Sequence, residues 1–180
     1  MSRTAATVAR MPRLILLNGP PACGKSTLAH RYVDEHPLAL NLDVDEVRGL
    51  LGRWRDDPHS AGLLARDIAL AAAGAHLTAG HDVVVPQFLA RTTFIDQLAD
   101  LAWHTAASFH EIVLLDSREN ILRRFAERPA TDPRHVEAVE LSAMYDRFTA
   151  MLALRPAARV VHVREGDVAE TYRAVLHSLA

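Results

Sequence analysis

The sequence predicts an α/β protein whose parallel sheet is covered by helices on both faces. Five apolar segments of strand length alternate along the chain with stretches that carry helix start and stop signals. Continuous apolar segments, rather than alternating ones, are typical of strands that are buried on both faces. Such strands need helical crossovers, which then cover the sheet. The expected strands are residues 14–17, 38–42, 82–85, 111–115 and 159–163.

Capping and breaking residues set the expected helix limits. Asp43 followed by Glu46 has capping-box spacing, and Gly80 is expected to end the long alanine-rich helix before it. Pro86 is expected to end the third strand, because proline cannot donate a hydrogen bond within a central ladder. Ser117 is expected to cap a helix. The predicted helices are residues 26–36, 43–51, 61–79, 92–104, 118–128 and 135–152, and one after Gly166.

The overall composition favours one domain over residues 1–180, with residues 1–12 as a flexible terminus. A single cysteine excludes an internal disulfide, and no apolar run reaches the roughly 20 residues that span a bilayer. We therefore expect a cytoplasmic protein without a membrane partner, a monomer or a homodimer. The net charge of −2 argues against nucleic acid as a partner, although it leaves room for a local basic patch.

The segment GPPACGKS has the G-x-x-x-x-G-K-S spacing of a phosphate-binding loop, between an apolar strand and a helix. Backbone N–H groups of such a loop bind phosphate oxygens, and Lys25 can reach the β- and γ-phosphates of a nucleotide. The Ser26 hydroxyl can bind the magnesium ion that accompanies ATP. The predicted ATP-binding residues are Gly19, Pro20, Pro21, Ala22, Cys23, Gly24, Lys25, Ser26 and Thr27.

Carboxylates after the second strand distinguish phosphate transfer from simple nucleotide binding. Asp45 is the predicted base, because an acceptor hydroxyl needs a carboxylate to orient it and take its proton. Asp43 is either a ligand in the magnesium site or only a helix cap. Arg48 lies one turn beyond Asp45 and is either a substrate contact or a surface arginine. Two further candidate substrate residues are Trp54 and Gln87, which follows the third strand. An aromatic residue in the position of Trp54 is more often part of the core.

A helix with two arginines four residues apart precedes a proline-containing loop. Arg124 and Arg128 could belong to a lid over about residues 124–135 and stabilise charge on the γ-phosphate. The alternative is a solvated arginine face. Asp116 ends an apolar strand as a metal-binding carboxylate would, but its position before Ser117 favours helix capping.

The motifs GPPACGKST, NLDVDEVR and R-x-x-x-R resemble those of the phosphate-loop kinases. Within them, the chain is similar to the group of chloramphenicol phosphotransferase, zeta toxin and polynucleotide kinase. This resemblance implies the sheet order 2-3-1-4-5, binding of ATP and Mg²⁺, Asp45 on the acceptor side, and Arg124 and Arg128 on the lid. Several of these kinases have an acidic residue at the end of the third strand, where this chain has Gln87.

These observations favour an ATP-dependent kinase that transfers the γ-phosphate to a hydroxyl of a small molecule, such as an antibiotic or a metabolite. A 5′-hydroxyl polynucleotide kinase is the enzymatic alternative and would need a basic channel. A nucleotide-binding regulator without an acceptor is the third hypothesis. The acceptor itself is not predicted by any motif in the sequence.

Overall fold

The structure is a computed structural model that describes residues 10–127, 138–164 and 166–180. Its centre is a five-stranded sheet with the order β2-β3-β1-β4-β5, in which every neighbouring pair is parallel. Both the predicted fold class and the strand order are confirmed. The strands are β1 (Arg13–Asn18), β2 (Leu40–Asn41), β3 (Val83–Gln87), β4 (Ser108–Leu115) and β5 (Arg159–His162).

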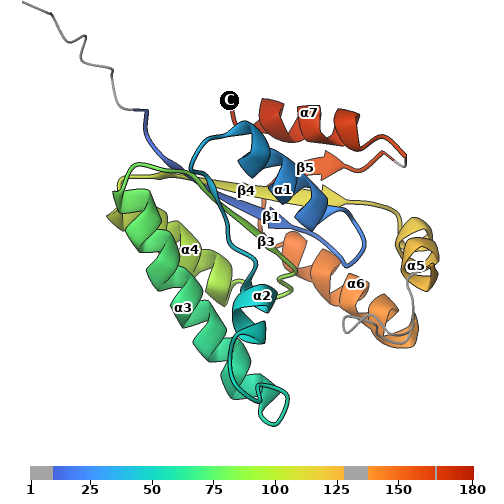
Figure 1. The fold of residues 1–180 in the computed structure, drawn as a ribbon. Coiled ribbons are helices and arrows are strands. Elements are labelled where there is room, and N and C mark those ends of the chain that lie inside the picture. Colours follow the sequence, from blue (N-terminus) through green and yellow to red (C-terminus); the bar gives the residue numbers. More distant parts are fainter. Residues whose placement is uncertain (1–9, 128–137, 165) are drawn as a thin grey trace, which may run out of the picture.

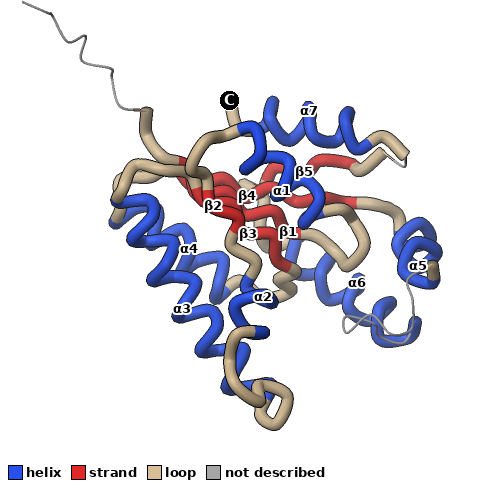
Figure 2. Tube along the Cα trace, in the orientation of Figure 1, coloured by secondary structure: helices blue, strands red, loops and turns tan. Residues whose placement is uncertain are grey.

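Helices cover both faces of the sheet, and two short helices lie beyond its carboxyl edge (Figures 1 and 2). One face carries α1 and α7, and the other carries α3, α4 and α6. The helices are α1 (Lys25–Glu35), α2 (Val44–Gly49), α3 (Pro58–Thr78), α4 (Thr93–His104), α5 (Arg118–Ala126), α6 (Ala138–Leu152) and α7 (Val168–Ser178).

Alternate residues of β1 build the two cores. Leu14 and Leu16 are buried against α3 and α4, whereas Ile15 and Leu17 are buried against α1 and α7. Side chains of a strand alternate between faces, so an all-apolar strand can supply both layers. The central position of β1 therefore fixes the loop that follows it between two packed layers.

Two proline positions differ from expectation. The long helix begins at Pro58 rather than at residue 61, because Asp57 accepts a hydrogen bond from Ser60 N and proline needs no N–H at the first helical position. Pro86 lies inside β3, opposite Leu17 of β1, instead of ending the strand. The ladder to β2 already ends at Asn41, so no β2 residue needs the missing Pro86 N–H.

The second strand and the fifth helix are shorter than predicted. β2 has only two residues, because Leu38 is exposed and has a left-handed backbone with φ of 63°. Thr92 is the N-cap of α4, as expected, but its side chain makes no capping hydrogen bond. α5 ends at Ala126, so Arg128 lies outside both this helix and the described residues.

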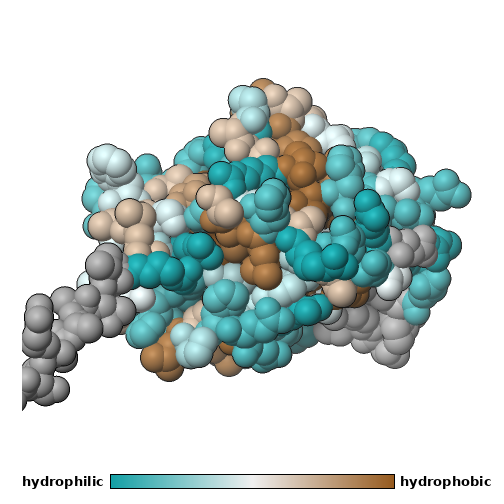
Figure 3. Space-filling view, turned by 90° about the horizontal axis from the view of Figure 1, so that it is seen from above, coloured by the Kyte–Doolittle hydropathy of each residue, from teal (hydrophilic) through white to brown (hydrophobic). Residues whose placement is uncertain are grey.

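Three further observations concern the N-terminal segment, the helices and the surface. The expected flexible terminus lies outside the described residues up to residue 9, while Pro12 O already accepts a hydrogen bond from Ser108 N. No helix in the described ranges has the length and hydrophobicity to cross a bilayer. Seen from the side of α1 and α7, hydrophilic side chains surround a limited hydrophobic patch (Figure 3).

Candidate active site at the carboxyl edge of the sheet

The loop between β1 and α1 leaves the carboxyl edge of the sheet, flanked by the ends of β3 and β4. Asn18, the last residue of β1, is fully buried and fixes the loop from below. Its Oδ1 accepts from Gly19 N at 2.8 Å and from Leu89 N at 2.9 Å, and its Nδ2 donates to Leu89 O at 3.1 Å. These bonds tie the start of the phosphate loop to the segment that follows β3. Asn18 was not among the predicted site residues.

Both glycines of the phosphate-loop motif are required by the backbone. A Cβ atom at Gly19 would lie 2.5 Å from Leu114 O and 2.8 Å from Cys23 Sγ, which no side chain can tolerate. Gly24 has φ of 92° and is the N-cap of α1, a left-handed conformation that glycine adopts at little cost. The remaining predicted loop residues range from the buried Pro20 and Cys23, through half-buried Pro21, Ala22 and Ser26, to the exposed Thr27.

The Lys25 ammonium lies across the loop. Its Nζ donates to Gly19 O and to Pro20 O, each at 2.8 Å. The third contact of the ammonium is a weak one to Cys23 Sγ at 3.8 Å, which a phosphate oxygen can replace. Lys25 is therefore placed to neutralise charge over the loop, at the N-terminus of α1.

On the acceptor side, α2 presents the two predicted carboxylates differently. Asp43 is the N-cap of α2, and its Oδ1 accepts from Asp45 N at 2.9 Å. Burial raises the pKa of Asp43, and the neighbouring carboxylates of Asp45 and Glu46 act in the same direction. Asp45 is half exposed and makes no capping bond, and its carboxylate lies at the surface of the site, where Oδ1 pairs with Arg48.

Arg48 is held from two sides. Its Nη2 lies 3.0 Å from Asp45 Oδ1, and its Cζ lies 4.6 Å from the centre of the Trp54 ring. The Arg55 guanidinium also lies over this ring, at 4.4 Å. Trp54 thus supports arginines through cation–π contacts, in a half-buried position beside α2.

Among the residues that the structure describes, three buried polar atoms at this edge have no hydrogen-bond partner: Asn41 Oδ1, Arg48 Nε and Gln87 Oε1. Gln87 is the last residue of β3 and lies opposite Asn18 of β1 in the register. The end of β3 therefore stands directly beside the start of the phosphate loop. No motif in the sequence predicts that these three atoms lack a partner.

On the other side of the loop, Arg124 forms an ion pair with the buried carboxylate of Asp116, the residue after β4. Asp116 Oδ1 also accepts from Ser117 N at 2.7 Å and from Asn120 Nδ2 at 2.9 Å. Ser117 is the actual N-cap of α5, so capping explains Ser117, and Asp116 instead anchors the helix. Ala22 at the tip of the loop packs against the cluster that α5 and α6 form.

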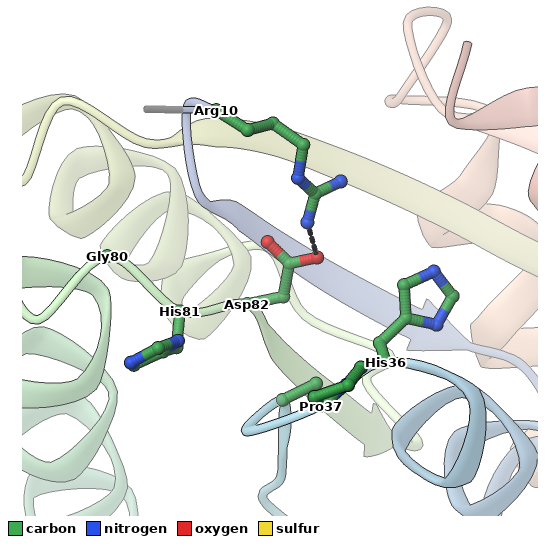
Figure 4. A pocket seen from close by; sticks show the side chains of 7 residues that line it. Arg10, His36, Pro37, Gly80, His81 and Asp82 are labelled. Carbon is green, nitrogen blue, oxygen red and sulfur yellow. Dashed lines mark hydrogen bonds and ion pairs between the residues drawn. The ribbon is translucent and has the colours of Figure 1, made fainter. Parts of the chain in front are cut away.

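A cavity of about 460 Å³ lies at the opposite, amino edge of the sheet and does not include any predicted site residue (Figure 4). The Asp82 carboxylate in its wall is paired with Arg10 and accepts from Tyr32 Oη at 2.6 Å and from Arg13 N at 2.8 Å. The carboxylate in this wall is thus fully paired. The predicted site residues lie instead at the carboxyl edge, where the strand order brings the phosphate-loop motif next to the end of β3.

The profile of the family described as AAA domain matches residues 14–151, which include the phosphate loop, α2 and most of the sheet. The chain belongs to this AAA domain family. A comparison with curated protein sequences finds no match.

Solved structures, among them two described as kinases, share the fold of this AAA domain protein. A gluconokinase from Sinorhizobium meliloti is 19% identical, with a TM-score of 0.65 over 94% of this chain and 93% of that one. A sugar kinase from Janibacter is 18% identical, with a TM-score of 0.67 over 93% and 94%. The tunicamycin resistance protein of Deinococcus radiodurans, also 18% identical, has a TM-score of 0.57 over 94% of each chain. At these identities the likeness establishes the phosphate-loop kinase fold.

The residues at the loop fit a nucleotide and its magnesium ion. The glycine-only approach at Gly19, the left-handed Gly24 and the lysine across the loop form a cradle for phosphates. Within the described residues, no three His, Cys, Asp or Glu side chains cluster as metal ligands. An ion at Ser26 would therefore rely on phosphate oxygens and water, as Mg²⁺ usually does in such sites.

Proposed function

We propose that the protein is an ATP-dependent phosphotransferase that acts on a hydroxyl of a small molecule. The observation that carries this proposal is the placement of a half-exposed carboxylate, Asp45, on a helix packed against β3, whose end lies beside the phosphate loop. A protein that only bound nucleotide would not need a carboxylate on that side.

In the proposed reaction, bound ATP with Mg²⁺ supplies the γ-phosphoryl group. The acceptor oxygen forms a bond to that phosphorus while the bond to the bridging oxygen of ADP breaks. Asp45 orients the acceptor hydroxyl and takes its proton, and Lys25 neutralises the phosphate oxygens. Ser26 would be the protein ligand of the ion, with Asp43 as the proposed carboxylate that binds it through a water molecule.

Arg124 and Arg128 stay proposed as cations near the transferred phosphate. Support for Arg124 comes from α5, which begins after β4 and packs against Ala22 of the loop. Its ion pair with Asp116 means that it would have to serve both partners or exchange one for the other. Arg128 lies outside the described residues.

The test is ADP release that depends on an added hydroxyl compound. We expect little release with ATP and Mg²⁺ alone and a large increase with at least one member of a panel of small sugars, sugar acids and antibiotics. Release that is equal with and without every acceptor would contradict the proposal in favour of a nucleotide-binding regulator. Labelling of a 5′-hydroxyl oligonucleotide at lower concentrations than any small molecule would favour the polynucleotide kinase instead.

A further inference from the structure

The unpartnered polar atoms of the carboxyl edge lie on three neighbouring elements. Asn41 and Gln87 are the last residues of the paired strands β2 and β3, and Arg48 is in the last turn of α2, which packs against β3. A buried polar atom without a partner costs about 1–3 kcal/mol. Such a group in a folded protein calls for a partner that completes it. Their position on the acceptor side points to the acceptor as that partner.

Arg48 restricts what the partner can be. A guanidinium has only donors and stays charged, so Arg48 Nε can be completed only by an acceptor atom. Hydrogen bonds from arginine are strongest to a carboxylate or a phosphate oxygen. The contact to Asp45 through Nη2 and the stacking on Trp54 hold the guanidinium in place, so its free donor has a fixed direction.

We infer that the phosphoryl acceptor is a polyhydroxy compound that carries an anionic group, a carboxylate or a phosphate, bound by Arg48. The inference rests on the proposed function, since it names the acceptor class of that same site. The anionic oxygen accepts from Arg48 Nε, and a hydroxyl of the acceptor donates to Gln87 Oε1.

The ion pair between Arg48 and Asp45 sets the distance between the anion and the reacting hydroxyl. Nε and Nη2 belong to one planar group, and Asp45 already occupies Nη2. The anion and the hydroxyl that Asp45 orients are thus held by two residues in direct contact. The acceptor should therefore carry its anionic group only a few bonds from the hydroxyl that is phosphorylated.

The two tryptophans of the chain allow a binding test that needs no turnover. Trp103 is exposed on α4, and in a Trp103→Phe protein the emission of Trp54 reports on the Arg48 that contacts its ring. Two matched pairs of probes differ in charge: gluconate with sorbitol, and glycerol 3-phosphate with glycerol. Titrations are made with and without ADP and Mg²⁺. We expect the anionic member of at least one pair to bind at least tenfold more tightly than its neutral partner, and the stronger pair identifies the anion.

Two arginine variants provide the decisive comparison. Arg48→Gln should abolish the preference for the anionic probe, whereas Arg55→Gln, which changes the other guanidinium on the same ring, should keep it. Equal affinity within both pairs, absence of binding by both anions, or an equal loss in Arg55→Gln would overturn the inference.

Failure of the inference is distinguishable from failure of the proposed function. Transfer to neutral hydroxyl compounds at an unchanged rate in Arg48→Gln would leave the kinase standing and remove the anionic acceptor. Anion-selective binding without phosphate transfer to any bound probe would leave the anion site at Arg48 standing and contradict the proposed phosphate transfer.

Discussion

The two edges of the sheet differ in whether selected buried polar groups have hydrogen-bond partners. At the amino edge, Asp82 lies in the wall of a cavity and is bound by Arg10, Tyr32 and the Arg13 backbone. At the carboxyl edge, Arg48 Nε and Gln87 Oε1 are buried without partners. Paired polar groups around a hollow stabilise the fold, whereas buried donors and acceptors without partners mark the place where a ligand is expected. Variants at the carboxyl edge should therefore affect turnover, with a loss of stability where a buried ion pair is broken, and variants at the amino edge should affect stability alone.

The largest effect on turnover is expected from Lys25→Ala. The change removes the ammonium that spans the loop at Gly19 O and Pro20 O, and should lower the rate of phosphate transfer by about 10³-fold while the fold persists. Rates are measured by ADP release, and folding by circular dichroism. Arg31→Ala on the same helix, which removes a surface ion pair with Glu35 and a cation–π contact with Tyr172 but nothing at the loop, is the control and should keep full activity. A folded, fully active Lys25→Ala protein would show that the site is elsewhere.

Asp45→Asn sharpens the assignment of the acceptor side. An amide can hold a hydroxyl but cannot take its proton, so turnover should fall by at least about 10²-fold with ATP affinity unchanged. Calorimetry with ATP and a turnover assay measure the two quantities. Unchanged turnover would move the role to Asp43, whose raised pKa suits a base. A loss of ATP binding would instead make Asp45 part of the metal site.

Arg124→Ala tests a carboxyl-edge cation that is paired with a buried carboxylate, Asp116. Removing it leaves the Asp116 carboxylate buried without its ion pair, which should lower the free energy of unfolding by about 3 kcal/mol. Urea unfolding measures this loss, and a second variant with Asp116→Asn in the same background should recover part of it. Turnover of the folded fraction tests the lid prediction: a fall larger than that in ATP affinity supports it, and no fall in either limits Arg124 to the ion pair.

The amino edge should respond to acid rather than to loss of a catalytic group. Burial alone would raise the pKa of Asp82, but the bonds from Tyr32, Arg13 N and Arg10 outweigh it and the pKa is lowered. A lowered pKa contributes stability above the unfolded value of about 4 and loses it as the pH falls through the folded pKa. Tyr32→Phe should cost about 1 kcal/mol at neutral pH and reduce this acid dependence. Urea unfolding between pH 7 and 3 measures it, and unchanged turnover is expected throughout the neutral range.

The smallest effect is expected at Cys23, the one thiol in the chain. It is buried with Leu17 and Leu28 in the core beneath α1, so an alkylating reagent should modify it only after denaturation. Mass spectrometry of the labelled peptide, with and without ATP and Mg²⁺, measures this. Rapid labelling of the native protein that nucleotide blocks would show instead that the thiol faces the phosphate site.

The sequence was sufficient for the fold where local signals agree. The apolar strand β1, the glycine motif, and the caps at Asp43 and Ser117 stand where they were predicted. Pro86 could not be placed correctly, because its tolerance inside β3 depends on the length of β2, a property of a different segment. The predicted start of α3 was wrong because proline is common both in loops and at the first position of a helix, so Pro58 alone does not tell the two apart.

The site was predictable only in its local part. The phosphate loop is a continuous motif, so its residues follow from spacing. In contrast, Asp116 meets Arg124 eight residues later, and Glu111 meets Arg155 across 44 residues, pairings that only the packing of α5 and α6 decides. Whether an atom such as Arg48 Nε lacks a hydrogen-bond partner likewise depends on the packing of other segments around it. No local sequence pattern contains that information.

The Asn18 side chain has a consequence for which substitutions this protein can accept. Both polar atoms of its amide are used: the oxygen accepts from two backbone N–H groups, and the nitrogen donates to Leu89 O. Aspartate would still accept from the two N–H groups, but its second oxygen would face Leu89 O and repel it. Leucine, which is of similar size, would leave all three backbone groups without a hydrogen-bond partner. In a survey of every single substitution along the chain, position 18 should accept asparagine alone, although it neither touches a phosphate nor belongs to the loop motif.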